Sequence, residues 1–219
     1  MHQVTHWYKK PSDLEGQVLS PFGPLIYQGR MSQETVDKTN QCIDKVKDDL
    51  SLDLVSQLAG RVELQRSLQE NIDPSCMDEI IEHVESFTVQ MGLPITSQDF
   101  QIQGLWANVQ QRYEYNPIHS HDGMFSFVYY TKNTITQEEA TTNKWDTVHD
   151  DTEGMNKPIG GSIELHYGEP QWCSQPSFLH FPQEGDLLVF PAWLRHSVYP
   201  FYCEGERVSI AGNIHQRER

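Results

Sequence analysis

The sequence predicts a mainly β fold, a β-sandwich or barrel, with helices flanking it on the N-terminal side. From residue 100 onward, short apolar stretches follow one another at close intervals, with Gly and Pro between them. Many short strands with frequent turns are typical of sandwiches and barrels. Before residue 95, by contrast, apolar residues recur at helical spacing in two stretches. At 219 residues the chain is long enough for one sizeable core.

Two helices are expected in the first hundred residues, each covering a sheet with its apolar face. The first begins after Ser32, a favourable N-cap residue, and its apolar positions are Val36, Ile43, Val46 and Leu50. The second begins near Pro74, because proline is common at the first position of a helix, and it ends before Pro94. Its apolar face comprises Met77, Ile80, Ile81, Val84 and Phe87.

Strands are expected wherever β-branched and aromatic residues cluster between turn residues. Two short ones precede the first helix, at Gln17–Leu19 and Leu25–Gln28. The others follow the second helix, at Phe100–Val109, Met124–Thr131, Gly161–Tyr167, Ser177–Phe181, Asp186–Phe190, His196–Tyr199 and Arg207–Ile214.

The charge balance argues against two classes of partner. The formal net charge is -15, from 31 Asp and Glu against 16 Lys and Arg. Phosphate backbones and anionic membrane surfaces both attract basic faces, so neither a nucleic acid nor a membrane is an expected partner. The four cysteines form no CxxC pair and fit no zinc pattern. Residues 1–10 are polar and do not resemble a signal peptide, so the expected compartment is the cytoplasm.

A His-x-His pair is the first candidate for metal chemistry. Residues two apart on a strand point to the same face, so His119 and His121 are expected to aim their imidazoles at one point. Imidazole suits iron, zinc, copper and nickel, so the pair does not select a metal. The alternative is two surface histidines that flank a turn. Three other histidines, His149, His166 and His180, lack matching spacing and are expected to be structural or surface residues.

A second candidate ligand follows a buried strand. Gly185 and Asp186 form a turn that leads into the apolar stretch Leu187–Phe190, which Pro191 ends. His196 then stands at the start of the next expected strand, and Trp193 before it is expected to pack in the core beside the ligand strand. A long separation from the His-x-His pair is expected when ligand strands are neighbours in a barrel and distant in sequence.

An Arg-x-Ser pair on the last strand is a candidate anion site. Arg207 and Ser209 share one face of their strand by the period of two. A guanidinium pairs with a carboxylate through two hydrogen bonds, and a neighbouring hydroxyl adds another. This pair therefore suits the far carboxylate of a dicarboxylic cosubstrate. The alternative for Arg207 is a surface or salt-bridged residue.

Together these elements resemble the iron(II)/2-oxoglutarate-dependent dioxygenase superfamily, and more narrowly the 2OG-Fe(II) oxygenase family of bacteria and phages. The His-x-His stretch is followed by Tyr129 and Tyr130, as in that family, and the stretch Phe190–His196 matches its Phe-Pro-x-Trp-Leu-x-His block. The segments Trp106–Val109 and Arg207–Asn213 also match. The resemblance covers roughly residues 105 to 213 and little of the N-terminal helices.

One departure concerns the third metal ligand. The wider superfamily has His-x-Asp at the first ligand position, which gives two histidines and one carboxylate. Here the residue two after His119 is His121, and Asp122 follows it. Strand geometry favours His121, while a local bulge would bring in Asp122 instead. A neutral third ligand would leave the metal more positive.

The resemblance implies a double-stranded β-helix, that is, a cupin-like jelly roll. It implies a single domain over residues 1–219, with residues 1–99 as an N-terminal helical support and residues 100–219 as the jelly-roll core. It implies iron(II) held by His119, His121 and His196, with 2-oxoglutarate as cosubstrate and O₂ as the second. No catalytic residue is expected beyond these ligands.

Three further residues are expected in the cosubstrate pocket. Related enzymes use a tyrosine hydroxyl against the cosubstrate carboxylate, and Tyr130 stands where such a tyrosine is expected. The alternative for Tyr130 is a core or rim aromatic. Asn108 and Asn213 are candidates to line the pocket, although asparagines near strand ends also bond to backbone.

The implied reaction is hydroxylation of a C–H bond, with release of succinate and CO₂. The substrate class is a small molecule or a peptide, and its identity does not follow from the sequence. One alternative is a cupin-like metal protein, an isomerase or direct dioxygenase, that does not use 2-oxoglutarate. Another is a non-catalytic jelly-roll binding module.

The polar segment Thr131–Pro158 is long for a plain connection and begins beside the expected site. It is interpreted either as a lid over the site or as a solvated excursion.

Overall fold

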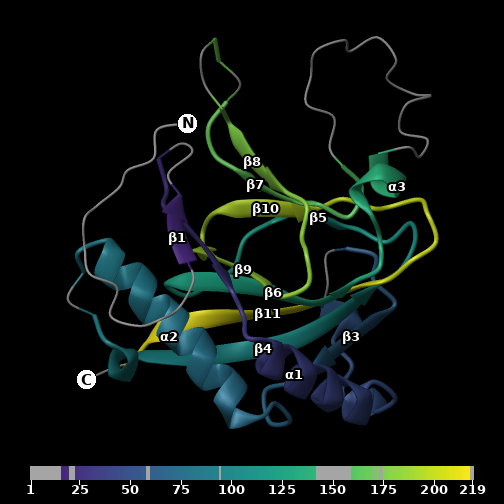
Figure 1. Ribbon diagram of the computed structural model, residues 1–219, viewed down its shortest axis with the longest axis horizontal. Coiled ribbons are helices and arrows are strands. Elements are labelled where there is room, and N and C mark those ends of the chain that lie inside the picture. Colours follow the sequence, from purple (N-terminus) through teal and green to yellow (C-terminus); the bar gives the residue numbers. More distant parts are fainter. Residues whose placement is uncertain are drawn as a thin grey trace.

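The computed structural model describes residues 16–19, 23–57, 60–93, 95–141, 159–169, 171–172 and 175–217, which form two antiparallel sheets (Figure 1). The larger sheet has, in spatial order, β1 (Gly16–Leu19), β2 (Ile26–Arg30), β9 (Asp186–Pro191), β6 (Phe125–Asn133), β11 (Arg207–Gln216), β4 (Phe100–Gln110) and β3 (Leu64–Ser67). The smaller has β5 (Asn116–His119), β10 (Arg195–Val198), β7 (Ile163–His166) and β8 (Ser177–His180). The predicted mainly β, jelly-roll architecture with flanking helices is confirmed.

The two main helices begin where the sequence predicts. Helix α1 (Gln33–Val46) is capped by Ser32, whose side chain accepts a hydrogen bond from the backbone N–H of Thr35. Helix α2 (Pro74–Gln90) is capped by Asp73 and has its proline in the first turn. Leu50 was wrongly placed on the first helix. That helix ends at Val46, and Leu50 is 78% exposed in the short 3₁₀ turn that follows.

Short helical turns complete the described chain. They are the 3₁₀ helices Leu50–Leu52, Val55–Gln57 and Ser97–Asp99, and the one-turn helix α3 (Gln137–Thr141). None of the described helices has the length and apolar character needed to cross a membrane.

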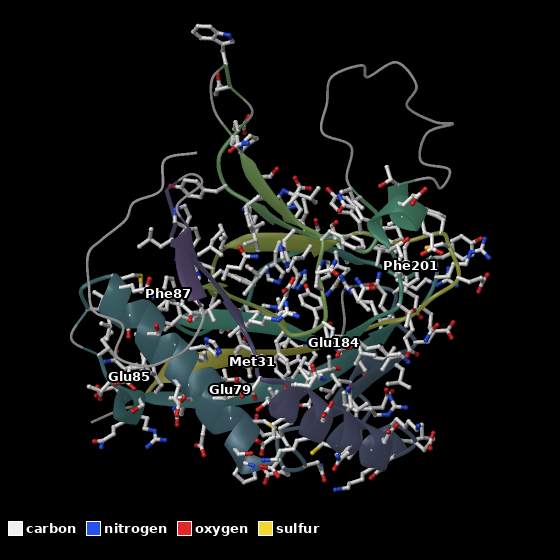
Figure 2. All side chains as sticks on the ribbon, in the orientation of Figure 1. Met31, Glu79, Glu85, Phe87, Glu184 and Phe201 are labelled. Carbon is white, nitrogen blue, oxygen red and sulfur yellow. The ribbon has the colours of Figure 1, made fainter. Side chains whose placement is uncertain are left out.

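Both main helices pack against one face of the larger sheet, on the side away from the smaller sheet (Figure 1). Phe87 of α2 lies against this face, with its ring centroid 5.3 Å from that of Phe125 on β6 (Figure 2). The carboxylate of Glu79 joins the two helices by accepting hydrogen bonds from the backbone N–H and the hydroxyl of Ser32. The helices therefore close one side of the sheet and leave its other face for the site.

The opposite face of the larger sheet meets the smaller sheet. Val128 and Tyr130 of β6 pack there with Ile163 and Leu165 of β7. Strand β11 shows how the pleat divides side chains between the two faces. Val208 and Ile210 join the helix-side core, whereas Arg207 and Ser209 line the space between the sheets. This alternation brings the predicted Arg-x-Ser pair to the inner face.

Three features differ from the sequence-based expectation. Strand β3 was not predicted, and β5 ends at His119, short of the strand that was expected to include His121. Together with β1 and β2, β3 makes three strands that residues 1–99 contribute to the larger sheet. Trp193, expected in the core, is 57% exposed in the turn between β9 and β10. Within the polar segment of residues 131–158, residues 131–133 complete β6 and residues 137–141 form α3. Residues 142–158 lie outside the described residues, so the lid stays a prediction.

Candidate active site

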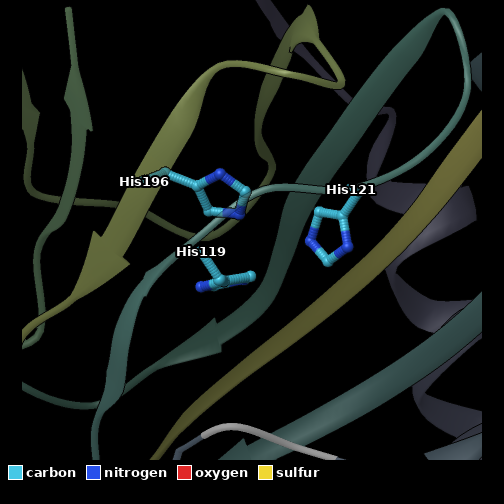
Figure 3. A group of neighbouring side chains, drawn as sticks. All are labelled: His119, His121 and His196. Atoms are coloured by element: carbon cyan, nitrogen blue, oxygen red, sulfur yellow. The ribbon is translucent and has the colours of Figure 1, made fainter.

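Three histidines from separate parts of the chain meet between the sheets (Figure 3). His119 ends β5, His196 lies on β10, and the two strands pair with these residues directly opposite each other. His121 lies just beyond β5 in the turn toward β6. The potential ligand atoms of all three lie within 4.8 Å of one another. The structure thus brings together the three residues that the sequence analysis selected as metal ligands.

Backbone carbonyls orient two of the three rings. Nδ1 of His119 lies 2.7 Å from the carbonyl oxygen of Pro117, and Nδ1 of His196 lies 3.0 Å from that of Leu194. A carbonyl oxygen only accepts hydrogen bonds, so in each ring Nδ1 carries the proton and donates it. Nε2 of each ring is then the unprotonated nitrogen that a metal requires.

His121 reaches the cluster by a route that differs from the expected one. The sequence analysis placed it on the same strand face as His119, but β5 ends at His119. Instead, the backbone N–H of His121 donates to the carbonyl of Ala192 at 2.9 Å, which ties the turn to the end of β9. The ring of Trp106 lies 5.5 Å from the His121 ring. Asp122, the alternative ligand, is exposed and does not belong to the histidine cluster.

Burial keeps the three imidazoles neutral. Loss of solvent, and after it the neighbouring His119, lower the pKa of His196 to about 3. The pKa of His121 falls to about 4 for the same two reasons. Burial also lowers the pKa of His119, although its bond to Pro117 opposes this. At neutral pH the cluster therefore needs no proton release before it binds a cation.

The cluster opens into a cavity of about 400 Å³ between the two sheets. All five residues expected to bind the cosubstrate line this cavity, namely Asn108, Tyr130, Arg207, Ser209 and Asn213. Strand register explains why they meet. Ser209 of β11 pairs with Asn108 on β4 to one side and with Tyr130 on β6 to the other, so the three stand in one row across the sheet.

Arg207 is a buried cation without an acidic partner in the described part of the chain. Its side chain is 3% exposed, and one terminal nitrogen donates to the carbonyl of Gly161. Its Nε has no hydrogen-bond partner, and no carboxylate of the described residues forms an ion pair with it. Burial lowers the pKa of Arg207, and the nearby Tyr130 opposes this shift. A buried, uncompensated charge is costly, so this site favours an anion.

Tyr130 and Ser209 place hydroxyl groups beside this guanidinium. The guanidinium carbon of Arg207 lies 5.3 Å from the centre of the Tyr130 ring. The Tyr130 hydroxyl is buried without a hydrogen-bond partner. Burial raises its pKa to about 12, so it remains a neutral donor at physiological pH. Ser209, which pairs with Tyr130 across the sheet, is buried, with 4% of its surface exposed. An anion that enters here meets one charge and two hydroxyl donors.

The two predicted asparagines have side-chain partners inside the cavity. The side-chain amides of Asn108 and Gln65 share a hydrogen bond of 2.8 Å. Oδ1 of Asn213 accepts a hydrogen bond of 3.0 Å from the hydroxyl of Ser126. Neither residue lies within hydrogen-bond distance of the histidine cluster. Both form the polar wall of the cavity, next to the anion site and the cluster.

The sequence analysis missed Gln65 and Asn116, which also line the cavity. Gln65 lies on β3, whose pairing with β4 could not be read from local sequence. Asn116 opens β5, three residues before His119, and this proximity in sequence was the available signal.

Histidines outside the cluster have structural partners in the described residues. His166 lies 2.9 Å from the hydroxyl of Ser197, and His180 lies 3.0 Å from a carboxylate oxygen of Asp186. These contacts agree with the structural role expected for both. His149 lies outside the described residues.

Solved structures of similar fold include two prolyl hydroxylases and HygX. A Pseudomonas putida prolyl-4-hydroxylase has 12% identity and a TM-score of 0.56, covering 88% of this chain and 93% of its own. A viral collagen prolyl hydroxylase from Paramecium Bursaria Chlorella virus-1, in complex with 2OG, has 13% identity and a TM-score of 0.51, covering 86% of this chain and 94% of its own. HygX from Streptomyces hygroscopicus, with nickel and 2-oxoglutarate bound, has 10% identity and a TM-score of 0.52, covering 90% of this chain and 84% of its own.

At these identities the likeness establishes the fold. No curated protein matches the chain in sequence. The family described as "Putative 2OG-Fe(II) oxygenase" matches residues 104–213, which is half of the chain. The matched region contains the three histidines, Tyr130, Arg207 and Ser209. The chain therefore belongs to the 2OG-Fe(II) oxygenase family.

Proposed function

We propose that this oxygenase is an iron(II)- and 2-oxoglutarate-dependent dioxygenase that hydroxylates a C–H bond of a small-molecule or peptide substrate and releases succinate and CO₂. The observation that carries the proposal is the pairing of two sites in one cavity. A cluster of three neutral imidazoles lines the same space as a buried guanidinium that has no counter-ion among the described residues.

The histidine cluster fits an iron(II) ion. Imidazole nitrogen suits iron, and His119 and His196 each have an Nε2 that their backbone bonds leave unprotonated. With His121 they would hold the ion, and Asp122 is too exposed to be the preferred ligand. Bound iron would supply the redox chemistry of oxygen activation, which no protein side chain provides.

The guanidinium site fits the far carboxylate of 2-oxoglutarate. Arg207 would pair with this carboxylate, while the hydroxyls of Tyr130 and Ser209 would donate to the same oxygens. The carboxylate would satisfy two groups that have no hydrogen-bond partner within the described ranges, Nε of Arg207 and the hydroxyl of Tyr130. The keto acid end of the cosubstrate would then point along the cavity toward the histidines.

The protein's own contribution is position and exclusion of water. Apolar side chains of both sheets line the wall between the two sites, among them Val128, Phe190 and Ile163. Water excluded from this wall cannot screen the pairing of Arg207 with a carboxylate, so the interaction is stronger than it would be at the surface. Only a substrate that reaches the cavity can meet the activated oxygen.

The alternatives account for less of the structure. A cupin-like isomerase or direct dioxygenase that does not use 2-oxoglutarate would have no need of the buried, unpaired Arg207. A non-catalytic binding module would have no need of three imidazoles converging in the same cavity. Structural neighbours include enzymes named for prolyl hydroxylation and HygX, and they support a peptide or a small molecule as the substrate class.

An anaerobic titration with iron(II) and 2-oxoglutarate tests the proposal. The metal-bound keto acid should give a weak visible charge-transfer band that saturates at one equivalent of each component. A band that requires both iron and 2-oxoglutarate supports the proposal. Iron binding without any response to 2-oxoglutarate would favour the cupin-like alternative, and failure to bind iron would favour the binding module.

A further inference from the structure

Asn116 is a polar side chain next to the histidine cluster for which the proposed function has no role so far. It opens strand β5 and lines the cavity. Its Nδ2 lies 3.5 Å from Nε2 of His119, the nitrogen left for the metal. No other side-chain donor in the described residues lies within hydrogen-bond distance of a ring nitrogen in the cluster.

Close packing fixes which way this amide faces. Gly60 lies against the back of the amide, and a Cβ at Gly60 would stand 2.6 Å from Oδ1 of Asn116. The backbones of Arg61 and Tyr115 exchange two hydrogen bonds, of 2.9 and 3.0 Å, which hold this approach in place. Nε2 of His119 carries no proton and can only accept a hydrogen bond, so Nδ2 is the amide atom that faces the cluster. Oδ1 is buried and has no hydrogen-bond partner in the described part of the chain.

A metal on the cluster changes what this N–H group can do. Once Nε2 of His119 donates its lone pair to an ion, it no longer accepts a hydrogen bond from Asn116. A buried amide donor without an acceptor costs free energy, so it favours a new acceptor at the same place. The atoms next to a metal-bound nitrogen are the other ligands of the same metal, and in this family these include oxygens of the keto acid.

We infer that Asn116 is a further cosubstrate-binding residue, which donates a hydrogen bond from Nδ2 to a metal-bound oxygen of the 2-oxoglutarate keto acid. This inference rests on the proposed function. Arg207 would hold one end of the cosubstrate and Asn116 the other, so the two residues fix its direction in the cavity.

The test compares Asn116→Ala and Asn116→Asp with the wild-type protein. Asn116→Ala removes the donor, so affinity for 2-oxoglutarate in the iron(II)-loaded protein should fall about tenfold, and the energy of the charge-transfer band should shift. Asn116→Asp keeps the shape of the side chain but places an acceptor and a negative charge against the keto acid carboxylate. This variant should therefore lose more 2-oxoglutarate affinity than Asn116→Ala. Affinity for cobalt(II) alone should not fall in Asn116→Ala, because this change removes a contact to Nε2 of His119 that the metal would displace, and it should rise in Asn116→Asp.

Two further variants separate a binding role from a structural one. Ile118→Ala lies on the same strand but is exposed, and it should leave both affinities and the band unchanged. Gly60→Ala is the structural reference, because a Cβ there would stand 2.4 Å from the carbonyl oxygen of Tyr115 and 2.6 Å from Oδ1 of Asn116. It should displace backbone and amide together, and so lower thermal stability along with 2-oxoglutarate affinity.

The inference is overturned if Asn116→Ala binds 2-oxoglutarate as the wild type does with an unshifted band, or if it loses cobalt affinity in parallel. Should the wild-type protein itself show no band, the proposed function fails first. The two failures are therefore distinguishable.

Discussion

At the scale of single residues, Arg207 separates a 2-oxoglutarate enzyme from other metal proteins of the same fold. Arg207→Lys keeps the positive charge but loses the planar fork that pairs with a carboxylate through two hydrogen bonds. Loss of such a charge-assisted bond costs about 1.5–3 kcal/mol, so 2-oxoglutarate affinity should fall about tenfold to a hundredfold. Metal affinity should stay unchanged, because Arg207 is not a ligand. Isothermal titration of both components measures the two effects separately.

The matched control for this change is Arg195→Lys. Arg195 is exposed on β10 next to His196, so the same substitution there should alter neither affinity. Indifference of 2-oxoglutarate affinity to Arg207→Lys would remove Arg207 from its role.

At the scale of elements, the turn between β5 and β6 positions His121. Gly123 in this turn has φ +106°, and a Cβ there would stand 2.9 Å from the carbonyl oxygen of Ile214. Gly123→Ala should therefore cost about 1–3 kcal/mol of stability and also weaken metal binding, because the turn must shift with His121 on it. Gly168→Ala is the control, since Gly168 has φ +81° in open space away from the histidines. Thermal melts and cobalt(II) titrations should show that both variants lose stability and that Gly123→Ala alone loses metal affinity.

The same turn shows how much of the site could be predicted from local sequence. The His-x-His spacing predicted the correct cluster, but on the premise of a strand that in fact ends at His119. The contact that holds His121, its N–H bond to Ala192, joins residues 71 positions apart, and no local pattern encodes it. Arg207 and Ser209 were predictable because the period of two on a strand fixes their common face. Strand β3 was missed because it is short and gains its stability from pairing with β4.

At the scale of the whole molecule, the buried histidines should make the metal-free protein sensitive to acid. Their pKa values in the folded state, about 3 for His196 and about 4 for His121, lie below the ordinary value near 6.5. Between these values the unfolded state binds more protons than the folded state, so stability falls as pH decreases from about 6.5. Each histidine should contribute up to about 1.4 kcal/mol per pH unit.

Urea denaturation of the metal-free protein between pH 7.5 and pH 4.5 measures this loss. His196→Gln should reduce the slope below pH 6.5, because the pKa of His196 is lowered further than that of His121. The same slope in the variant and in the wild type would show that other groups cause the acid sensitivity.

The most direct measurement is a crystal structure of the protein grown anaerobically with iron(II) and 2-oxoglutarate. The metal should be bound by the Nε2 atoms of His119, His121 and His196 at about 2.0–2.2 Å, the usual imidazole distance. The far carboxylate of 2-oxoglutarate should pair with Arg207. Iron bound by Asp122 in place of His121 would correct the ligand set and leave the rest intact. Iron outside the histidine cluster, or a cosubstrate carboxylate away from Arg207, would contradict the central claim.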